Sequence, residues 1–259
     1  MSKIFIGVVT FARDEQYLPL LIDHIKAQDE KDWSIHFIDT TVCNGYSTES
    51  YVPRLKKYLS KHLPNNSWTV DEYTIKRMPN DPTYLFLVNC RNLLREKFLA
   101  SDATHYFSID SDVMIPPNTF SALLSDNTDV AAGAYLTSML IRNSTHPEGI
   151  VQIRPVAAVR DPDLPIDCVR PMIINSLLEP KVMPILATGF GCSLIKRKVF
   201  ENISIQFNAD ECSTDDFLFY LAMEKAGYTL LLDTRLLCTH LKYPIGDERN
   251  KALDFANYR

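Results

Sequence analysis

The sequence lacks the features that mark several large classes of protein. No apolar run in its 259 residues approaches the roughly 20 residues that cross a bilayer, so no membrane span is expected. Residues 1–10 are too few and too strand-like for a signal peptide. The six cysteines include no Cys-x-x-Cys pair, which disfavours zinc and redox motifs and favours reduced cysteines in a cytoplasmic protein. A net charge of −5 disfavours a nucleic-acid-binding surface.

Glycine is also scarce, with eight in the chain, and none of them forms a phosphate-binding loop. The first expected strand is followed by Phe-Ala-Arg-Asp-Glu at 11–15, where sugar nucleotidyltransferases have a glycine-rich loop. The dinucleotide pattern Gly-x-Gly-x-x-Gly is absent too, because Gly189-Phe190-Gly191 leads into a strand-like run. Both of these nucleotide-binding classes are therefore disfavoured.

The first half of the chain alternates between apolar, β-branched runs and segments with helical spacing of apolar residues. Expected strands cover 4–10, 33–39, 68–75, 106–109 and 130–136, and expected helices cover 17–28, 50–62 and 85–100. This alternation predicts an α/β fold, Rossmann-like, with a mostly parallel central sheet and helices on both faces.

The second half is less regular. Residues 146–184 hold seven of the 15 prolines, so we expect an irregular insertion with a short edge ribbon around 150–159. Such a loop serves as a lid or binding surface, or merely connects elements. Order is expected again over 185–196, in a helix over 214–226 that Gly227 ends, and in a strand over 228–232. The charged tail after His240 is expected to fray.

Two aspartates, Asp110 and Asp112, follow an apolar strand in mid-chain. In extended backbone an Asp-x-Asp pair directs both carboxylates to one side, which makes a hard-oxygen site suited to Mg²⁺ or Mn²⁺. Ligands of parallel sheets bind beyond the carboxyl ends of strands, and Thr10, Asp39 and Asp110 all fall at such ends. The pattern predicts a metal site for a diphosphate-bearing substrate; the alternative is a solvated turn or a helix cap.

These pieces, in this order, resemble GT-A-fold glycosyltransferases of the family 2 type. The matching segments are 8–13 (Val-Val-Thr-Phe-Ala-Arg), Asp39, 89–92 (Asn-Cys-Arg-Asn), Asp110-Ser111-Asp112, 187–197, 214–219 (Thr-Asp-Asp-Phe-Leu-Phe) and the stretch from Asp233 to His240. They span nearly the whole chain. Two positions depart from the family pattern, because Asp215 stands where Glu is usual and Cys90 where Ala is usual.

The resemblance implies a single GT-A-like domain over 1–259, with a nucleotide-sugar-binding half at 1–112 and an acceptor-binding half at 113–259 that holds the irregular insertion. The implied donor-binding residues are Thr10, Phe11, Arg13, Asp39, Arg91, Asp110 and Ser111. For Phe11, core packing competes with stacking on the nucleobase. For Arg91, an exposed helical charge competes with a partner of the diphosphate.

The resemblance also implies a cation, Mn²⁺ or Mg²⁺, with Asp112 as direct ligand, Asp110 in water-mediated or ribose contact, and His240 as an imidazole ligand. Against this, a lone histidine is more often structural. Asp216 is the candidate general base and Asp215 the second candidate. Both would also serve as helix-start acids behind the N-cap Thr214, where the helix dipole lowers carboxylate basicity.

The expected reaction is inverting transfer of a sugar from a nucleotide diphosphate, UDP as the commonest, to a hydroxyl of a glycan, a lipid-linked sugar or another acceptor. A retaining transferase with the same metal site and a non-catalytic nucleotide-sugar- or glycan-binding protein remain alternatives. A haloacid-dehalogenase-type phosphatase is disfavoured. Its Asp-x-Asp lies near the N-terminus with Thr or Val two residues later, where this chain has Met114.

Overall fold

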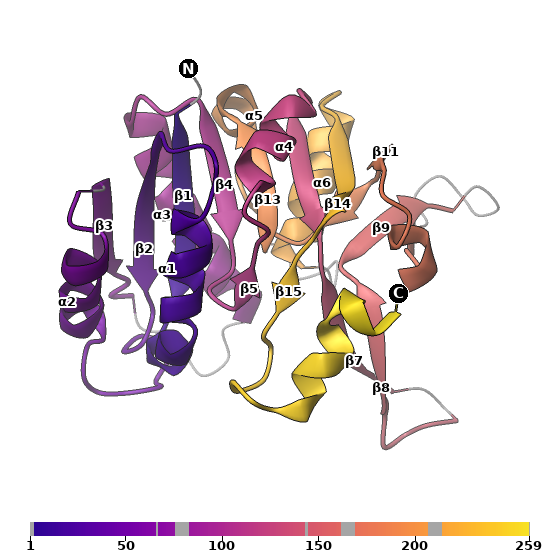
Figure 1. Cartoon of the computed structure of the whole chain (residues 1–259), viewed down its shortest axis with the longest axis horizontal. Helices are drawn as coiled ribbons and strands as arrows, with labels where there is room; N and C mark the ends of the chain where they lie inside the picture. The colour runs from indigo at the N-terminus through magenta and orange to yellow at the C-terminus, as the bar shows by residue number, and fades with distance from the viewer. Residues whose placement is uncertain are drawn as a thin grey trace.

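The computed structural model describes residues 3–65, 67–75, 83–142, 145–161, 169–206 and 214–258. Within these ranges the strands form one eight-stranded sheet and three smaller sheets (Figure 1). In spatial order the large sheet contains β11 (Val182–Pro184), β14 (Leu230–Leu237), β6 (Val130–Ala134), β13 (Cys192–Lys196), β4 (His105–Ile109), β1 (Ile4–Thr10), β2 (Trp33–Asp39) and β3 (Ser67–Glu72).

The order of this sheet confirms the predicted mostly parallel arrangement. Strands β4, β1, β2 and β3 run parallel, and β14 runs parallel to β6. Strand β13 is antiparallel to both of its neighbours, and β11 is an antiparallel edge strand. Strand β14 begins at Leu230 and continues to Leu237, well past the predicted end at 232. The strand predicted over 130–136 is divided at Tyr135, where the chain leaves the large sheet.

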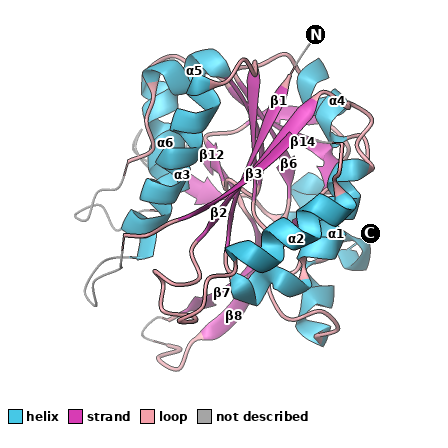
Figure 2. Cartoon of the chain, turned by 90° about the vertical axis from the view of Figure 1, so that its left-hand side faces the viewer, coloured by secondary structure: helices cyan, strands magenta, loops and turns pink. Residues whose placement is uncertain are grey.

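Helices cover both faces of the sheet, as predicted (Figure 2). One face is covered by α1 (Leu18–Lys26), α2 (Val52–His62) and α4 (Thr119–Ser125), and the other by α3 (Thr83–Ala100), α5 (Arg197–Asn202) and α6 (Asp215–Lys225). The spacing of apolar residues decides which side of each helix packs. In α1, Leu21, Ile22 and Ile25 are at most 1% exposed, and burial of each stabilises the fold by about 1.5–3 kcal/mol.

The proline-rich segment is more ordered than the sequence predicted. Strand β7 (Leu136–Ile141) pairs with β8 (Ile150–Pro155) in a hairpin, and β9 (Ala157–Arg160) lies between β10 (Val169–Pro171) and β12 (Ala187–Thr188). A 3-10 turn, η2, covers Ile174–Leu177. The short edge ribbon predicted around 150–159 is therefore confirmed, whereas the rest of the described segment is less irregular than expected; residues 162–168 lie outside the described part. Three of the prolines end strands that lie at the edges of their sheets, where a missing N–H is tolerated.

The C-terminal segment does not fray, which corrects a second expectation. Two 3-10 turns, η4 (Glu248–Leu253) and η5 (Phe255–Tyr258), bury Leu253 and Phe255 in the core. The Asn250 side chain holds the preceding turn, since its Oδ1 accepts from Tyr243 N at 3.0 Å and its Nδ2 donates to Tyr243 O at 2.7 Å. Apolar burial outweighs the charged composition here. No helix in the described ranges is long and apolar enough to cross a membrane.

Candidate functional site

Several predicted site residues meet beyond the carboxyl ends of β1 and β4. A cavity of about 360 Å³ lies there, and we call it the acidic cavity. Its ionisable lining residues are Asp14, Arg91, Asp110, Asp112 and His240. The lining also includes Phe11, Thr40, Asn44 and Ser111. Three carboxylates face two basic side chains, so the cavity has a surplus of negative charge that a divalent cation would compensate.

Asp112 and His240 are brought together by a short strand pairing. Strand β5 (Val113–Met114) pairs antiparallel with β15 (Thr239–His240), with His240 opposite Val113. His240 Nδ1 donates to the Leu136 carbonyl at 2.9 Å, so Nε2 faces Asp112 Oδ2 at 3.4 Å. Burial lowers the pKa of His240, but the hydrogen bond and charge of Asp112 outweigh it, so the pKa is raised. A carbonyl-anchored imidazole with a carboxylate at its other nitrogen is a typical arrangement for cation binding.

The donor set fits a cation that takes part of its coordination from a ligand. Among the described residues, no group of three or more His, Cys, Asp or Glu side chains is arranged to hold a metal. Asp112 and His240 offer two donors 3.4 Å apart, and adjacent ligands of a small octahedral cation lie roughly 3 Å apart for bonds of about 2.1 Å. Cations of nucleotide-dependent enzymes keep their other positions for phosphate oxygens and water.

Arg91, on α3, is enclosed by carboxylates. Its side chain is 12% exposed and forms ion pairs with Asp215 and, at 3.4 Å, with Asp110 Oδ1. The guanidinium also lies 4.7 Å above the ring centre of Phe190. Burial alone would lower the pKa of Arg91, but Asp215 and Asp110 raise it, so the cation persists. The interpretation as an exposed helical charge is wrong; contact with a diphosphate remains a prediction.

The two acids of α6 differ in what surrounds them. Thr214 has extended backbone at the N-cap, as predicted, and Asp215 is buried against Arg91. Asp216 instead lines a second cavity of about 290 Å³ with mostly apolar walls, which we call the apolar cavity. Burial and the neighbouring Asp215 raise the pKa of Asp216, although its Oδ1 accepts from Phe217 N at 2.8 Å. Burial and Asp215 therefore outweigh the helix dipole, which was expected to lower the basicity of Asp216.

Two residues without a local sequence motif also shape the site. Asp14 is 5% exposed and accepts from Ser111 Oγ at 2.6 Å; burial, with Asp112, raises the pKa of Asp14 to about 6. A single acid in the polar run 13–16 carries no motif that would have singled it out. Tyr135 is buried and its Oη accepts from Gly191 N at 3.1 Å; burial, then the charges of Asp110 and Asp216, raise its pKa. A Cβ at Gly189 would fall 2.0 Å from Tyr135 Oη, which explains that glycine.

The remaining predicted donor residues occupy varied positions. Phe11 lines the acidic cavity, with its ring edge-on to Tyr46 at 5.5 Å, so it is not a core residue. Arg13 is more than half exposed and pairs with Asp14 at 3.5 Å. Its guanidinium also lies 4.5 Å above Phe11.

Thr10 and Asp39 pair in register at the ends of β1 and β2. Both are buried, and Asp39 Oδ1 accepts from Thr41 N at 3.1 Å and Thr41 Oγ1 at 2.6 Å. The Thr10 carbonyl accepts from Thr40 N and Oγ1, each at 2.9 Å. These contacts hold the loop after β2 against the cavity. Neither residue lines the cavity itself.

Comparison with known proteins identifies the fold. No family model matches the sequence, and no curated protein matches it. GalNAc-T7 with UDP, GalNAc and Mn²⁺ is similar at 12% identity over 93% of this chain and 44% of that one, with a TM-score of 0.59. The mannosyltransferase PcManGT from Pyrobaculum calidifontis with GDP-Man and Mn²⁺ is similar at 12% identity over 94% of this chain and 58% of that one, with a TM-score of 0.54. S. aureus TarS 1–349 is similar at 16% identity over 91% of this chain and 60% of that one, with a TM-score of 0.52.

This chain therefore spans 44% to 60% of the length of these three structures. The identities are low, so the likeness concerns the arrangement of the backbone. It agrees with the mostly parallel central sheet and its flanking helices. The chain has the GT-A fold, which is the fold that the sequence resemblance implied.

Proposed function

We propose that this protein is a metal-dependent glycosyltransferase that moves a sugar from a nucleotide diphosphate, UDP in the first instance, to a hydroxyl acceptor. The observation that carries the proposal is the Asp112–His240 pair in an acidic cavity next to a second cavity that holds Asp216. The nucleotides and Mn²⁺ in structures of the same fold support a nucleotide-linked donor. The donor would bind in the half at 1–112 and the acceptor in the half at 113–259.

Asp112 and His240 would hold the cation, Mn²⁺ in preference to Mg²⁺ because imidazole is a softer donor than oxygen. When bound, the cation offsets the negative charge of the departing diphosphate. Asp110 would contact the ribose or a cation-bound water, while Arg91 fixes its orientation from the other side. Ser111, tied to Asp14, would keep the two aspartates in their relative positions. Phe11, on the cavity wall, would stack on the nucleobase.

Asp216 would act as the general base. A sugar hydroxyl becomes an effective nucleophile when its proton is removed as the new bond forms, and a carboxylate with a raised pKa is the better acceptor of that proton. The hydroxyl oxygen would bond to the anomeric carbon as the bond to the diphosphate oxygen breaks, and the proton would end on Asp216. A single displacement of this kind inverts the anomeric configuration. Asp215, held by Arg91, would position Asp216.

The experiment is a thermal-shift screen against UDP-, GDP-, CMP- and dTDP-sugars, each with and without Mn²⁺, followed by assays of transfer and donor hydrolysis. A donor at 100 times its Kd should stabilise the fold by about 2.7 kcal/mol, and only when Mn²⁺ is present. Stabilisation without any turnover would instead identify a nucleotide-sugar-binding protein. A metal-independent shift, or none, would contradict the proposal.

A further inference from the structure

The apolar cavity has an unusual lining for a site that binds a sugar alone. Its walls include apolar side chains from β7, β8 and β9 and from the start of α6, namely Met139, Pro155, Val156, Ala157 and Phe217. Polar groups are few: the threonines at 137, 188 and 214, and the charged residues Arg154 and Asp216. Unsubstituted sugar hydroxyls against such walls would lose hydrogen bonds to water without replacement.

Arg154 is the basic residue of this cavity. It lies on β8 directly opposite Thr137 of β7, and both side chains line the cavity. Arg154 is partly buried, and no carboxylate among the described residues pairs with it. The acidic cavity does not include it, so a diphosphate bound there would not satisfy it. A partly desolvated guanidinium with free donors is suited to a carboxylate or phosphate.

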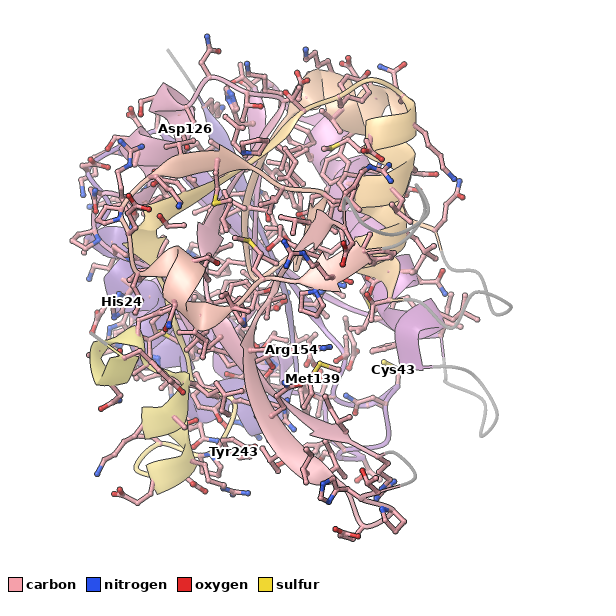
Figure 3. All side chains as sticks on the ribbon, turned by 90° about the vertical axis from the view of Figure 1, so that its right-hand side faces the viewer. His24, Cys43, Asp126, Met139, Arg154 and Tyr243 are labelled. Carbon is pink, nitrogen blue, oxygen red and sulfur yellow. The ribbon has the colours of Figure 1, made fainter. Side chains whose placement is uncertain are left out.

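The hairpin continues the apolar wall beyond the cavity. Strand alternation puts Thr137, Met139 and Ile141 on one face of β7, with Arg154 and Ile150 as neighbours on β8. Met139 lines the cavity and is 40% exposed, and Ile150, nearer the tip, is 43% exposed. Figure 3 shows Met139 and Arg154 side by side on this hairpin. Apolar surface left open beside a charged side chain favours a ligand with both characters.

We infer that the acceptor is an amphipathic anion, which deepens the proposed function and rests on it. Its reacting hydroxyl lies at Asp216, a carboxylate or phosphate close to that hydroxyl pairs with Arg154, and an apolar group lies along Met139 and Ile150. A neutral, unsubstituted glycan would leave Arg154 without a partner and would not cover the apolar wall. The same chemistry occurs in an anionic lipid headgroup and in a soluble aryl or alkyl conjugate.

The test is calorimetric binding of four sugars that differ only in these two groups: methyl glucoside, methyl glucuronide, p-nitrophenyl glucoside and p-nitrophenyl glucuronide. The aryl glucuronide should bind about tenfold more tightly than either compound with one of the two groups, a difference of about 1.4 kcal/mol. Co-sedimentation with phosphatidylinositol vesicles then separates the sources. Sedimentation assigns a lipid acceptor, and its absence together with aryl glucuronide binding assigns a soluble one.

Matched variants of the hairpin isolate each contact. Arg154→Met should remove the preference for the carboxylate, while Arg142→Met, an exposed arginine on the same hairpin outside the cavity lining, should keep it. Met139→Ser should remove the preference for the aryl group, while Leu140→Ser should keep it. Leu140 is more exposed, at 54%, but faces the other side of the strand. Circular dichroism of each variant checks that the hairpin still folds.

Equal or undetectable affinity for all four sugars would overturn the inference, as would an unchanged carboxylate preference in Arg154→Met. The Mn²⁺-dependent donor shift is measured on the same preparations. Its loss would reject the transferase proposal, whereas a retained donor shift without acceptor discrimination would reject the acceptor class alone.

Discussion

The two cavities differ in how they are built and in what they contain. The acidic cavity lies beyond parallel strands and holds three carboxylates, one arginine and one histidine. The apolar cavity lies under a hairpin and a three-stranded sheet, with Arg154 and Asp216 as its charged residues. Arg91 and Asp215 connect the two, because Arg91 contacts Asp110 and Asp215 precedes Asp216. Charge is therefore concentrated where a diphosphate would leave, and shape and hydrophobicity where an acceptor would be selected.

The largest expected effect is in the acidic cavity. Asp112→Asn should lower the transfer rate by about 5 kcal/mol of activation free energy, or several thousandfold, because the cation loses its charged ligand. The measurement is turnover at saturating Mn²⁺, with Asp102→Asn, an exposed carboxylate of a surface ion pair, as control. Turnover of Asp112→Asn within tenfold of wild type would show that Asp112 is not a ligand.

The corresponding change in the apolar cavity should affect a different step. Asp216→Asn should lower the turnover rate by about a thousandfold while the Kd of the donor stays the same, because a general base contributes 10²- to 10⁴-fold. Single-turnover rates and the Mn²⁺-dependent thermal shift measure the two quantities. If donor affinity falls together with the rate, the separation between the two cavities is wrong.

The Arg91–Asp215 ion pair, which connects the two cavities, should contribute to the stability of the fold. Arg91→Met leaves Asp215, which is 3% exposed, buried and unpaired, so it should lower the free energy of unfolding by about 3–5 kcal/mol. The double variant Arg91→Met/Asp215→Leu should recover much of that loss, since the buried charge of Asp215 is removed as well. Urea denaturation of both variants provides the comparison. Equal instability of the single and double variants would indicate that packing, not charge, is lost.

His240 should have a smaller and more specific effect. His240→Gln should weaken Mn²⁺ binding by about one to two orders of magnitude without changing acceptor binding in the apolar cavity. Calorimetric titration of Mn²⁺ in the presence of UDP measures this change. His24→Gln is a suitable control, because His24 Nδ1 bonds the Ile115 carbonyl outside both cavities.

The smallest expected effect concerns a buried acid outside both cavities. Burial, then the charge of Asp233, raises the pKa of Asp126 to about 6, against the opposing effect of Arg235. A raised folded-state pKa gives stability that is complete below about pH 4 and lost as pH rises through 6. In Asp126→Asn this pH-dependent loss of stability should be smaller by about 1–2 kcal/mol. The figure is below the full value of the pKa shift because Arg235, the partner of Asp126, is 48% exposed and its charge is screened by solvent. Urea denaturation at pH 4 and pH 7 measures it; parallel curves for wild type and variant would contradict the assignment.

The sequence predicted the donor side of the molecule better than the acceptor side. Strands at 4–10 and 33–39 were predicted to the residue because parallel central strands are continuous apolar runs. The ribbon around 150–159 was predicted, but its pairing with β7 and the packing of Leu253 and Phe255 were not, because prolines and charges suggested irregular structure where long-range contacts determine the fold. The same holds for the site. Asp110 and Asp112 have a local pattern, whereas Asp14, Tyr135 and Arg154 acquire their roles from neighbours remote in sequence.

The position of the cation tests the account most directly. A crystal grown with UDP and Mn²⁺ and measured at the manganese absorption edge should show an anomalous peak between Asp112 Oδ2 and His240 Nε2, in contact with diphosphate oxygens. A peak elsewhere, or UDP bound with no peak between these two side chains, would contradict the assignment of the acidic cavity.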